Sequence, residues 1–178
     1  MNLRKMKRKE KCKFCLTVAE KAKEYIDNKE AYVLVELAIE RCWNWISGKH
    51  NIAEELYSYL DNEEDGFTIF QETETDEIII AAWDSVIDAI AYICKSAYVT
   101  EKKKYVPEPI ELVDDNTITH MMKSFSVCER SNKKPINILY ENLWQRDLLR
   151  NIDCQIHLYM NSCDGVPFYR STVFLMIL

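Results

Sequence analysis

The sequence predicts an all-α protein, a single-domain bundle of about five to seven helices. Three observations lead to this prediction. The length of 178 residues favours one domain, apolar residues recur at helical spacing, and there are only three glycines and four prolines. Glycine averages about 7% of typical chains, and mainly β proteins need turn residues about every 8–12 positions. Because P-loop, Rossmann and kinase folds also need clustered glycines, these classes are poor fits as well.

Apolar stripes and end signals place the helices of the first half of the chain. A first helix is expected over about residues 15–28, and a second over residues 34–46, where Gly48 provides a stop signal. Asn51, with a glutamate three positions later, resembles a capping box and predicts a short helix over residues 51–60.

The middle of the chain predicts a loop followed by the longest helix. Residues 61–75 read as a polar loop whose apolar members, Phe67, Ile69 and Phe70, fold back onto the core. Thr75 or Asp76 then caps a helix whose apolar residues cover roughly half of its circumference. We therefore expect this to be the central helix.

The last part of the chain begins with a proline-containing loop at residues 107–109. Further helices are expected over residues 116–125 and 135–159. Residues 166–178 form an apolar tail that either packs on the core or pairs with a second chain, as in a homodimer. Residues 1–178 are taken as one domain.

The N-terminal arm, residues 1–13, carries seven basic side chains and one acid. It fits the solvated start of a helix better than a nucleic-acid site, because the chain as a whole is acidic and the arm lacks interleaved aromatic residues. No secretory signal opens the sequence, and no apolar stretch reaches the roughly 20 residues that a membrane span needs. We expect a cytoplasmic protein with reduced cysteines and with no nucleic-acid or membrane partner.

Charge is distributed unevenly along the chain. The net charge is −6, and the stretch from His50 to Cys94 contains twelve acids and no lysine or arginine. Like charges this close repel one another and destabilise the compact state. The acidic stretch therefore suggests that its side chains serve an interaction outside the chain.

The seven cysteines offer the first candidate chemistry. Cys12 and Cys15 lack the second ligand pair that a zinc site needs, so no metal is predicted; we expect Cys15 in the core and Cys12 near the surface. Cys154 with His157, or Cys128 with His120, could form a thiolate–imidazole couple. No base, orienting group and oxyanion donors converging on either pair can be read from the sequence, so no catalytic residue and no cofactor are assigned.

Acid pairs at helical spacing are a second candidate. Glu36 with Glu40 and Asp84 with Asp88 could suggest a carboxylate-bridged metal site, but a di-iron bundle needs Glu-x-x-His on two helices, a motif this chain lacks. Solvated helix faces explain all four acids. Trp43 and Trp45, at opposite margins of one helix stripe, are expected to seal the edges of the core, with a partner-binding role as the alternative.

Three segments carry a resemblance to a known family. They read Leu37-Ala38-Ile39-x-x-Cys42-Trp43-x-Trp45, then Glu55-Leu56-Tyr57-x-Tyr59-Leu60-Asp61, then Ala82-Trp83-x-x-x-Ile87-x-Ala89-Ile90-Ala91-Tyr92 with Ala97-Tyr98. Over roughly residues 30–115 the chain resembles the sixth numbered family of immunity proteins encoded beside bacterial polymorphic, contact-dependent toxins. The resemblance implies an all-helical binder that neutralises a toxin without catalysis. It assigns no catalytic residues and does not define the toxin's activity.

The charge pattern and the resemblance point in one direction. Immunity proteins that block nucleases commonly present acid clusters to a basic toxin surface, and such complementarity speeds association and selects partners. We therefore expect a cytoplasmic, non-enzymatic immunity protein that occludes its cognate toxin. The candidate contact residues, centred on the loop at residues 63–65, are Glu54, Glu55, Asp61, Glu63, Glu64, Asp65, Glu72, Glu74, Asp76 and Glu77. Two other classes stay open: a small helical enzyme or metal or redox protein that uses the cysteines, and a regulatory adaptor for another basic partner.

Overall fold

A computed structural model of the protein describes residues 5–49 and 51–130. All of them belong to one of the two units into which the chain divides, Met1–Leu143. In this described part the chain forms seven α-helices and no strand, which confirms the predicted all-α class. They are α1 (Arg8–Ala22), α2 (Lys29–Ile46), α3 (Ala53–Leu60), α4 (Phe67–Glu72), α5 (Glu77–Glu101), α6 (Glu108–Glu111) and α7 (Asp115–Arg130), with a 3-10 turn η2 (Lys23–Tyr25) after α1. The helix expected at 135–159 and the tail at 166–178 lie outside the described residues.

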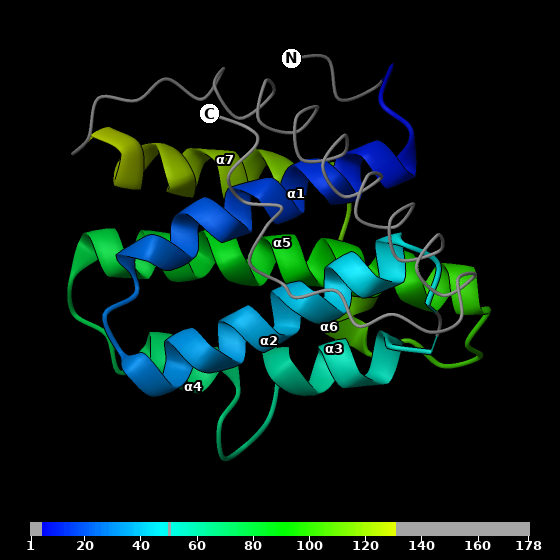
Figure 1. The fold of residues 1–178 in the computed structure, drawn as a ribbon, viewed down its shortest axis with the longest axis horizontal. Helices are drawn as coiled ribbons and strands as arrows, with labels where there is room; N and C mark the ends of the chain where they lie inside the picture. Colours follow the sequence, from blue (N-terminus) through cyan, green and yellow to red (C-terminus); the bar gives the residue numbers. More distant parts are fainter. Residues whose placement is uncertain (1–4, 50, 131–178) are drawn as a thin grey trace, which may run out of the picture. The chain divides into compact units, whose positions relative to one another are not determined.

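Helix α5 is the centre of this unit (Figure 1). It contacts each of the other six α-helices. In the view of Figure 1, α1 and α7 run along its upper side, and α2, α3 and α4 lie below it. Buried residues occur at most positions between Ala81 and Tyr98. A helix that is buried around most of its circumference is a core helix, as the breadth of its apolar face predicted.

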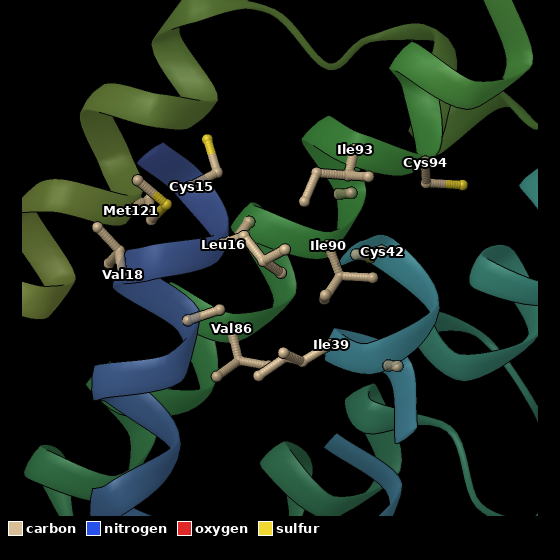
Figure 2. Packing of buried hydrophobic residues seen from close by; sticks show 14 of the residues in the cluster. Cys15, Leu16, Val18, Ile39, Cys42, Val86, Ile90, Ile93, Cys94 and Met121 are labelled. Atoms are coloured by element: carbon tan, nitrogen blue, oxygen red, sulfur yellow. The ribbon is translucent and has the colours of Figure 1, made fainter. Parts of the chain in front are cut away.

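The core is made where α1, α2, α5 and α7 meet (Figure 2). Leu16 and Val18 come from α1, Ile39 from α2, Ile90 from α5 and Met121 from α7, and all are buried. Figure 2 shows Val18 on α1 and Met121 on α7 pointing toward each other. Each fully buried aliphatic side chain stabilises the fold by about 1.5–3 kcal/mol, so this shared contact holds helices that are distant in sequence.

The segment expected to be a polar loop, residues 61–75, contains helix α4. The ring centroid of Trp83 lies 5.6 Å from that of Phe67 and 6.0 Å from that of Phe70, which stacks on it. Residues three apart lie on one helix face, so this contact with α5 favours a helical turn in a stretch too short to show a clear period. The expectation that Ile69 also folds back was wrong, because its side chain is 37% exposed.

Two N-caps position the longest helices. Asp76 accepts hydrogen bonds from the backbone N–H groups of Ile78 and Ile79, so α5 begins where the sequence predicted. Asn28 caps α2 in the same way. The apolar stripe predicts that the first helix continues to about Asn28, but α1 ends at Ala22 and is followed by η2.

The capping box predicted at Asn51 is not formed. Asn51 has a φ of 66°, and the helix begins after Ile52, whose N–H donates to Glu101 Oε1 over 3.0 Å. The group that satisfies this helix end therefore comes from the far end of α5. The proline-containing segment also differs from expectation, because it includes the short helix α6.

The N-terminal arm and the following cysteine also differ from the sequence-based picture. Helix α1 begins at Arg8, so residues 8–13 of the arm are helical. Cys12 was expected near the surface but is fully buried, with its Sγ 3.4 Å from Ser96 Oγ on α5. Packing of α1 against α5 explains both findings.

Candidate docking surface

The candidate contact acids lie on α3, on the loop that joins α3 to α4, on α4 and at the start of α5. In Figure 1 this loop, residues 61–66, lies below the helices at the lower edge of the view. No lysine or arginine occurs between residues 51 and 94, so neutralising groups for these acids must come from elsewhere. The structure separates the ten acids into those that have partners within the chain and those that do not.

Two of the acids on α3 form ion pairs with other elements. Glu54 Oε1 lies 3.0 Å from Lys103 Nζ, and Glu55 Oε1 lies 2.8 Å from Arg41 Nε on α2. These bases were not singled out from the sequence, because they lie outside the acidic stretch. Both pairs are at the surface, where an ion pair contributes about 0–1 kcal/mol.

Three further acids have local structural roles. Asp61 accepts a 2.5 Å hydrogen bond from the Tyr57 hydroxyl. This bond raises the pKa of Tyr57 to about 12. Glu74 accepts from the backbone N–H groups of Thr75 and Asp76, and Asp76 is the N-cap of α5. A substitution at either of these last two positions would therefore act on the start of the central helix as well as on the surface.

The remaining five acids are surface groups that stabilise no contact within the described part of the chain. Their side chains are exposed and form no hydrogen bond or ion pair with the described part of the chain. They are Glu63, Glu64, Asp65, Glu72 and Glu77. Because no group in residues 5–49 or 51–130 compensates them, these carboxylates are the most available for a partner.

The loop that presents three of these acids has a defined backbone. The side chain of Asn62 accepts a hydrogen bond from the N–H of Glu64, and the backbone O of Asn62 accepts from the N–H of Gly66. A Cβ on Gly66 would meet the backbone N of Asn62 at 2.5 Å. Only glycine allows this close approach without a shift of the loop. Gly66 therefore determines the loop conformation that exposes residues 63–65.

Asp84 and Asp88 are not the solvated pair that the sequence suggested. Asp84 accepts a 2.6 Å hydrogen bond from Gln71 Nε2, and Asp88 Oδ2 lies 2.6 Å from His120 Nδ1 on α7. Burial raises the pKa of Asp88, while His120 lowers it. The partner of each acid lies on another helix, which the spacing within α5 could not reveal. Glu36 and Glu40 are exposed, as expected.

The described cysteines are buried, and this burial disfavours ionisation of their thiols. Cys12, Cys15, Cys42, Cys94 and Cys128 are free and buried. Desolvation raises the pKa of each, to about 12 for Cys94 and about 11 for Cys128. Because the thiolate is the nucleophile and the metal ligand, such thiols are poor in either role. Cys154, His157 and Cys163 lie outside the described residues.

The other residues that the sequence suggested as candidate site residues have different contacts in the structure. His120 contacts Asp88 instead of Cys128, whose Sγ lies 3.8 Å from the backbone O of Ser124. Trp43 is buried and its Nε1 donates to Glu20 on α1 over 2.9 Å.

Within residues 5–49 and 51–130, no group of three or more His, Cys, Asp or Glu side chains is placed to hold a metal ion. In the same part of the chain, none of the helices combines the length and apolarity of a membrane span.

Helical packing around α5, together with an acidic surface that is only partly compensated by the described residues, fits a domain that binds another protein. The chain belongs to the immunity protein Imm6 family, whose model matches residues 10–128. This confirms the family resemblance carried by the three sequence segments. Toxin immunity is therefore the functional class, and a toxin is the partner that the family implies. No curated protein and no solved structure matches the chain.

Proposed function

We propose that this protein neutralises a cognate toxin by binding its functional surface and covering it, without catalysis, in the bacterial cytoplasm. The observation that carries the proposal is the acidic stretch of residues 51–94, which contains no lysine or arginine and belongs to an immunity-family chain. The toxin surface that fits this stretch is basic. A surface that binds an anionic substrate has this character, and covering it would block the toxin.

The acids that have no partner among the described residues support a contact centred on the loop between α3 and α4. Glu63, Glu64 and Asp65 are exposed and lie close together, with Gly66 holding the loop in shape. Like charges held side by side repel one another, and a basic partner would relieve that repulsion. Complementary charge of this kind also accelerates encounter and rejects wrong partners.

Glu54, Glu55 and Asp61 extend this candidate surface along α3, and Glu72, Glu74, Asp76 and Glu77 extend it across α4 to the start of α5. Glu54 and Glu55 are already paired with Lys103 and Arg41. A basic toxin surface would compete with these weak exposed pairs, so we place the two acids at the rim of the contact. The loop acids have no such competing pair within the described part of the chain.

The experiment uses a candidate toxin domain as the probe, chosen from the genes that neighbour the gene for this protein. We expect the two purified proteins to form a complex whose association rate falls as salt is added, because screening shortens the reach of surface charges. We also expect co-expression of this protein to restore growth of cells that produce the toxin domain.

Two results would overturn the proposal. Absence of a complex would remove the binding step, and the chain would then need another explanation, such as an adaptor role toward a different basic protein. Restored growth at catalytic amounts of this protein, with chemically altered toxin recovered from the cells, would replace occlusion with an enzymatic mechanism. Mass spectrometry of the recovered toxin distinguishes the two mechanisms.

A further inference from the structure

A groove of about 440 Å³ lies beside the acidic loop. Its walls come from α3, α4, α5 and α6 and from the first turn of α7. Its surface is mostly apolar, with Leu60, Ile87 and Ile110 among its lining residues. The volume is within the range of roughly 300–1,000 Å³ that is usual for ligand sites. It is large enough for side chains of a partner to enter.

Two carboxylates line this apolar groove. Asp61 lies at the end of α3, directly before the loop acids, and the Tyr57 hydroxyl holds its carboxylate in place. Asp88 lies on α5, with its side chain 19% exposed and its carboxylate against His120. No lysine or arginine is among the described residues that line the groove. The groove therefore combines apolar walls with two carboxylates, one of which, Asp88, already has His120 as a neighbour.

An exposed leucine marks the rim of the same groove. Leu112 follows α6 and is 76% exposed, although its side chain is large and apolar. A single exposed apolar residue is ordinary on a protein surface. This one borders a hollow that contains two carboxylates, so a partner that entered the hollow would bury the leucine as well.

We propose that this groove is the anchor point of the toxin complex and binds an arginine or lysine side chain of the toxin. The alkyl part of that side chain packs on Leu60 and Ile87, and its charged end meets the carboxylates of Asp61 and Asp88. Long basic side chains bury their methylene groups against apolar surface while the charged head keeps polar partners. The inference rests on the proposed toxin-binding function and assigns a specific contact to it.

The groove and the loop then contribute to different rates. Exposed charges at a rim act mainly on association and on its salt dependence, whereas a desolvated charge contact acts mainly on dissociation. Glu63, Glu64 and Asp65 lie outside the groove lining and would steer the toxin, while Asp61 and Leu112, which line the groove, would hold it. This division makes the anchor testable separately from the steering surface.

The first test measures association and dissociation rates of the toxin domain with two groove variants, Asp61→Asn and Leu112→Ala. The asparagine keeps an acceptor for the Tyr57 hydroxyl, so the local hydrogen bond is retained. Glu40→Gln and Val33→Ala are matched controls, because both residues are exposed on α2, outside the groove. We expect dissociation to become about tenfold faster in each groove variant, with association changed by less than about twofold. The controls should match the wild type.

The second test identifies the occupant by photo-crosslinking from position 112. A crosslink to a toxin segment that contains an arginine or lysine supports the proposal. A crosslink within this chain, a crosslink to a second copy of it, or unchanged dissociation rates would overturn it. If the wild type neither binds the toxin domain nor protects cells, the proposed function itself fails. Binding by the wild type, with the same dissociation rate in the groove variants, would refute the anchor alone.

Discussion

Lys11 Nζ lies 2.7 Å from both carboxylate oxygens of Asp115, so an ion pair joins α1 to the first residue of α7. The two partners differ in exposure: the Lys11 side chain is 12% exposed and the Asp115 side chain 47%. This basic residue of the N-terminal arm thus has a structural partner outside the acidic stretch. Loss of the aspartate would leave an ammonium group that has little access to water.

Asp115→Ala should therefore destabilise the protein more than Lys11→Met. We expect the alanine variant to lower the free energy of unfolding by about 1–3 kcal/mol, because a poorly solvated charge loses its partner. The methionine keeps most of the alkyl packing and removes the charge, so its cost should stay below about 1 kcal/mol. Urea unfolding of the two single variants and the double variant measures the coupling. Equal costs for the two single variants would contradict this account.

The second prediction concerns the core at Trp83. Its side chain is 1% exposed and packs against Phe67 and Phe70. Trp83→Ala should lower the free energy of unfolding by about 3–5 kcal/mol, since it leaves a large cavity in the centre of the fold. Leu112→Ala is the surface control and should change it by less than about 0.5 kcal/mol. A loss under about 1 kcal/mol for the tryptophan variant would mean that α5 is not central.

The third prediction separates partner binding from folding. Replacing Glu63, Glu64 and Asp65 by lysine should leave the helices intact, because these side chains have no partner in the described part of the chain. Association with the toxin domain should slow, and salt should slow the wild type more than the variant. The measurements are a thermal melt of both proteins and association rates at low and high salt. Equally fast binding by the variant, together with a salt-independent wild-type rate, would place the contact elsewhere on the protein.

The fourth prediction concerns pH and Asp88. Burial raises the pKa of this carboxyl above its ordinary value, and the like charge of Asp84 on α5 adds to this, while His120 on α7 opposes it. The folded state therefore holds the proton more tightly than the unfolded chain. The contribution of Asp88 to stability is fully present below its ordinary pKa near about 4 and is lost as pH rises through its raised pKa.

Asp88→Asn removes this dependence, so the stability of the wild type relative to the variant should fall as pH rises above about 4. Urea unfolding of both proteins across the acidic range gives the difference at each pH. Glu40→Gln, on an exposed face of α2, provides the control for removing one acid. A difference between wild type and Asp88→Asn that is constant over the range would show that Asp88 keeps its ordinary pKa.

The fifth prediction tests the cysteine-based alternative. Burial raises the pKa of the thiols at positions 12, 15, 42, 94 and 128, so few of them ionise near neutral pH. We expect all five to react with an alkylating reagent only when the protein unfolds, because the thiolate is the reactive form. Peptide mapping after labelling of native and denatured protein identifies each site. Rapid labelling of any of the five in the native protein would reopen a catalytic or redox role for that residue.

What the sequence could reveal depended on how local the determining interactions were. Asp76 caps α5 through the next backbone N–H groups along the chain, and the apolar face of that helix is continuous, so both were predictable. Helix α4 was not, because its helical turn depends on Phe67 and Phe70 meeting Trp83 on another helix. Burial of Cys12 likewise depends on the packing of α1 against α5.

The candidate surface shows the same limit. Charge counting located the acidic stretch, but it could not distinguish Glu54, which is paired with Lys103, from Glu63, which has no partner in the described residues. The groove was not foreseen, because its lining comes from five separate helices and the segments between them. Asp61 was a candidate only for its charge, and its position between the loop and the groove became visible in the structure.

The isolation of the loop acids from the rest of the described structure also bears on how this protein can evolve. Substitutions at exposed positions without partners change stability by less than about 0.5 kcal/mol in most proteins, so drift at Glu63, Glu64 and Asp65 would meet little resistance from folding. Gly66 and Asn62 meanwhile keep the backbone of the loop in place. Replacement of these three side chains can therefore adjust the surface to an altered toxin without remodelling the helices.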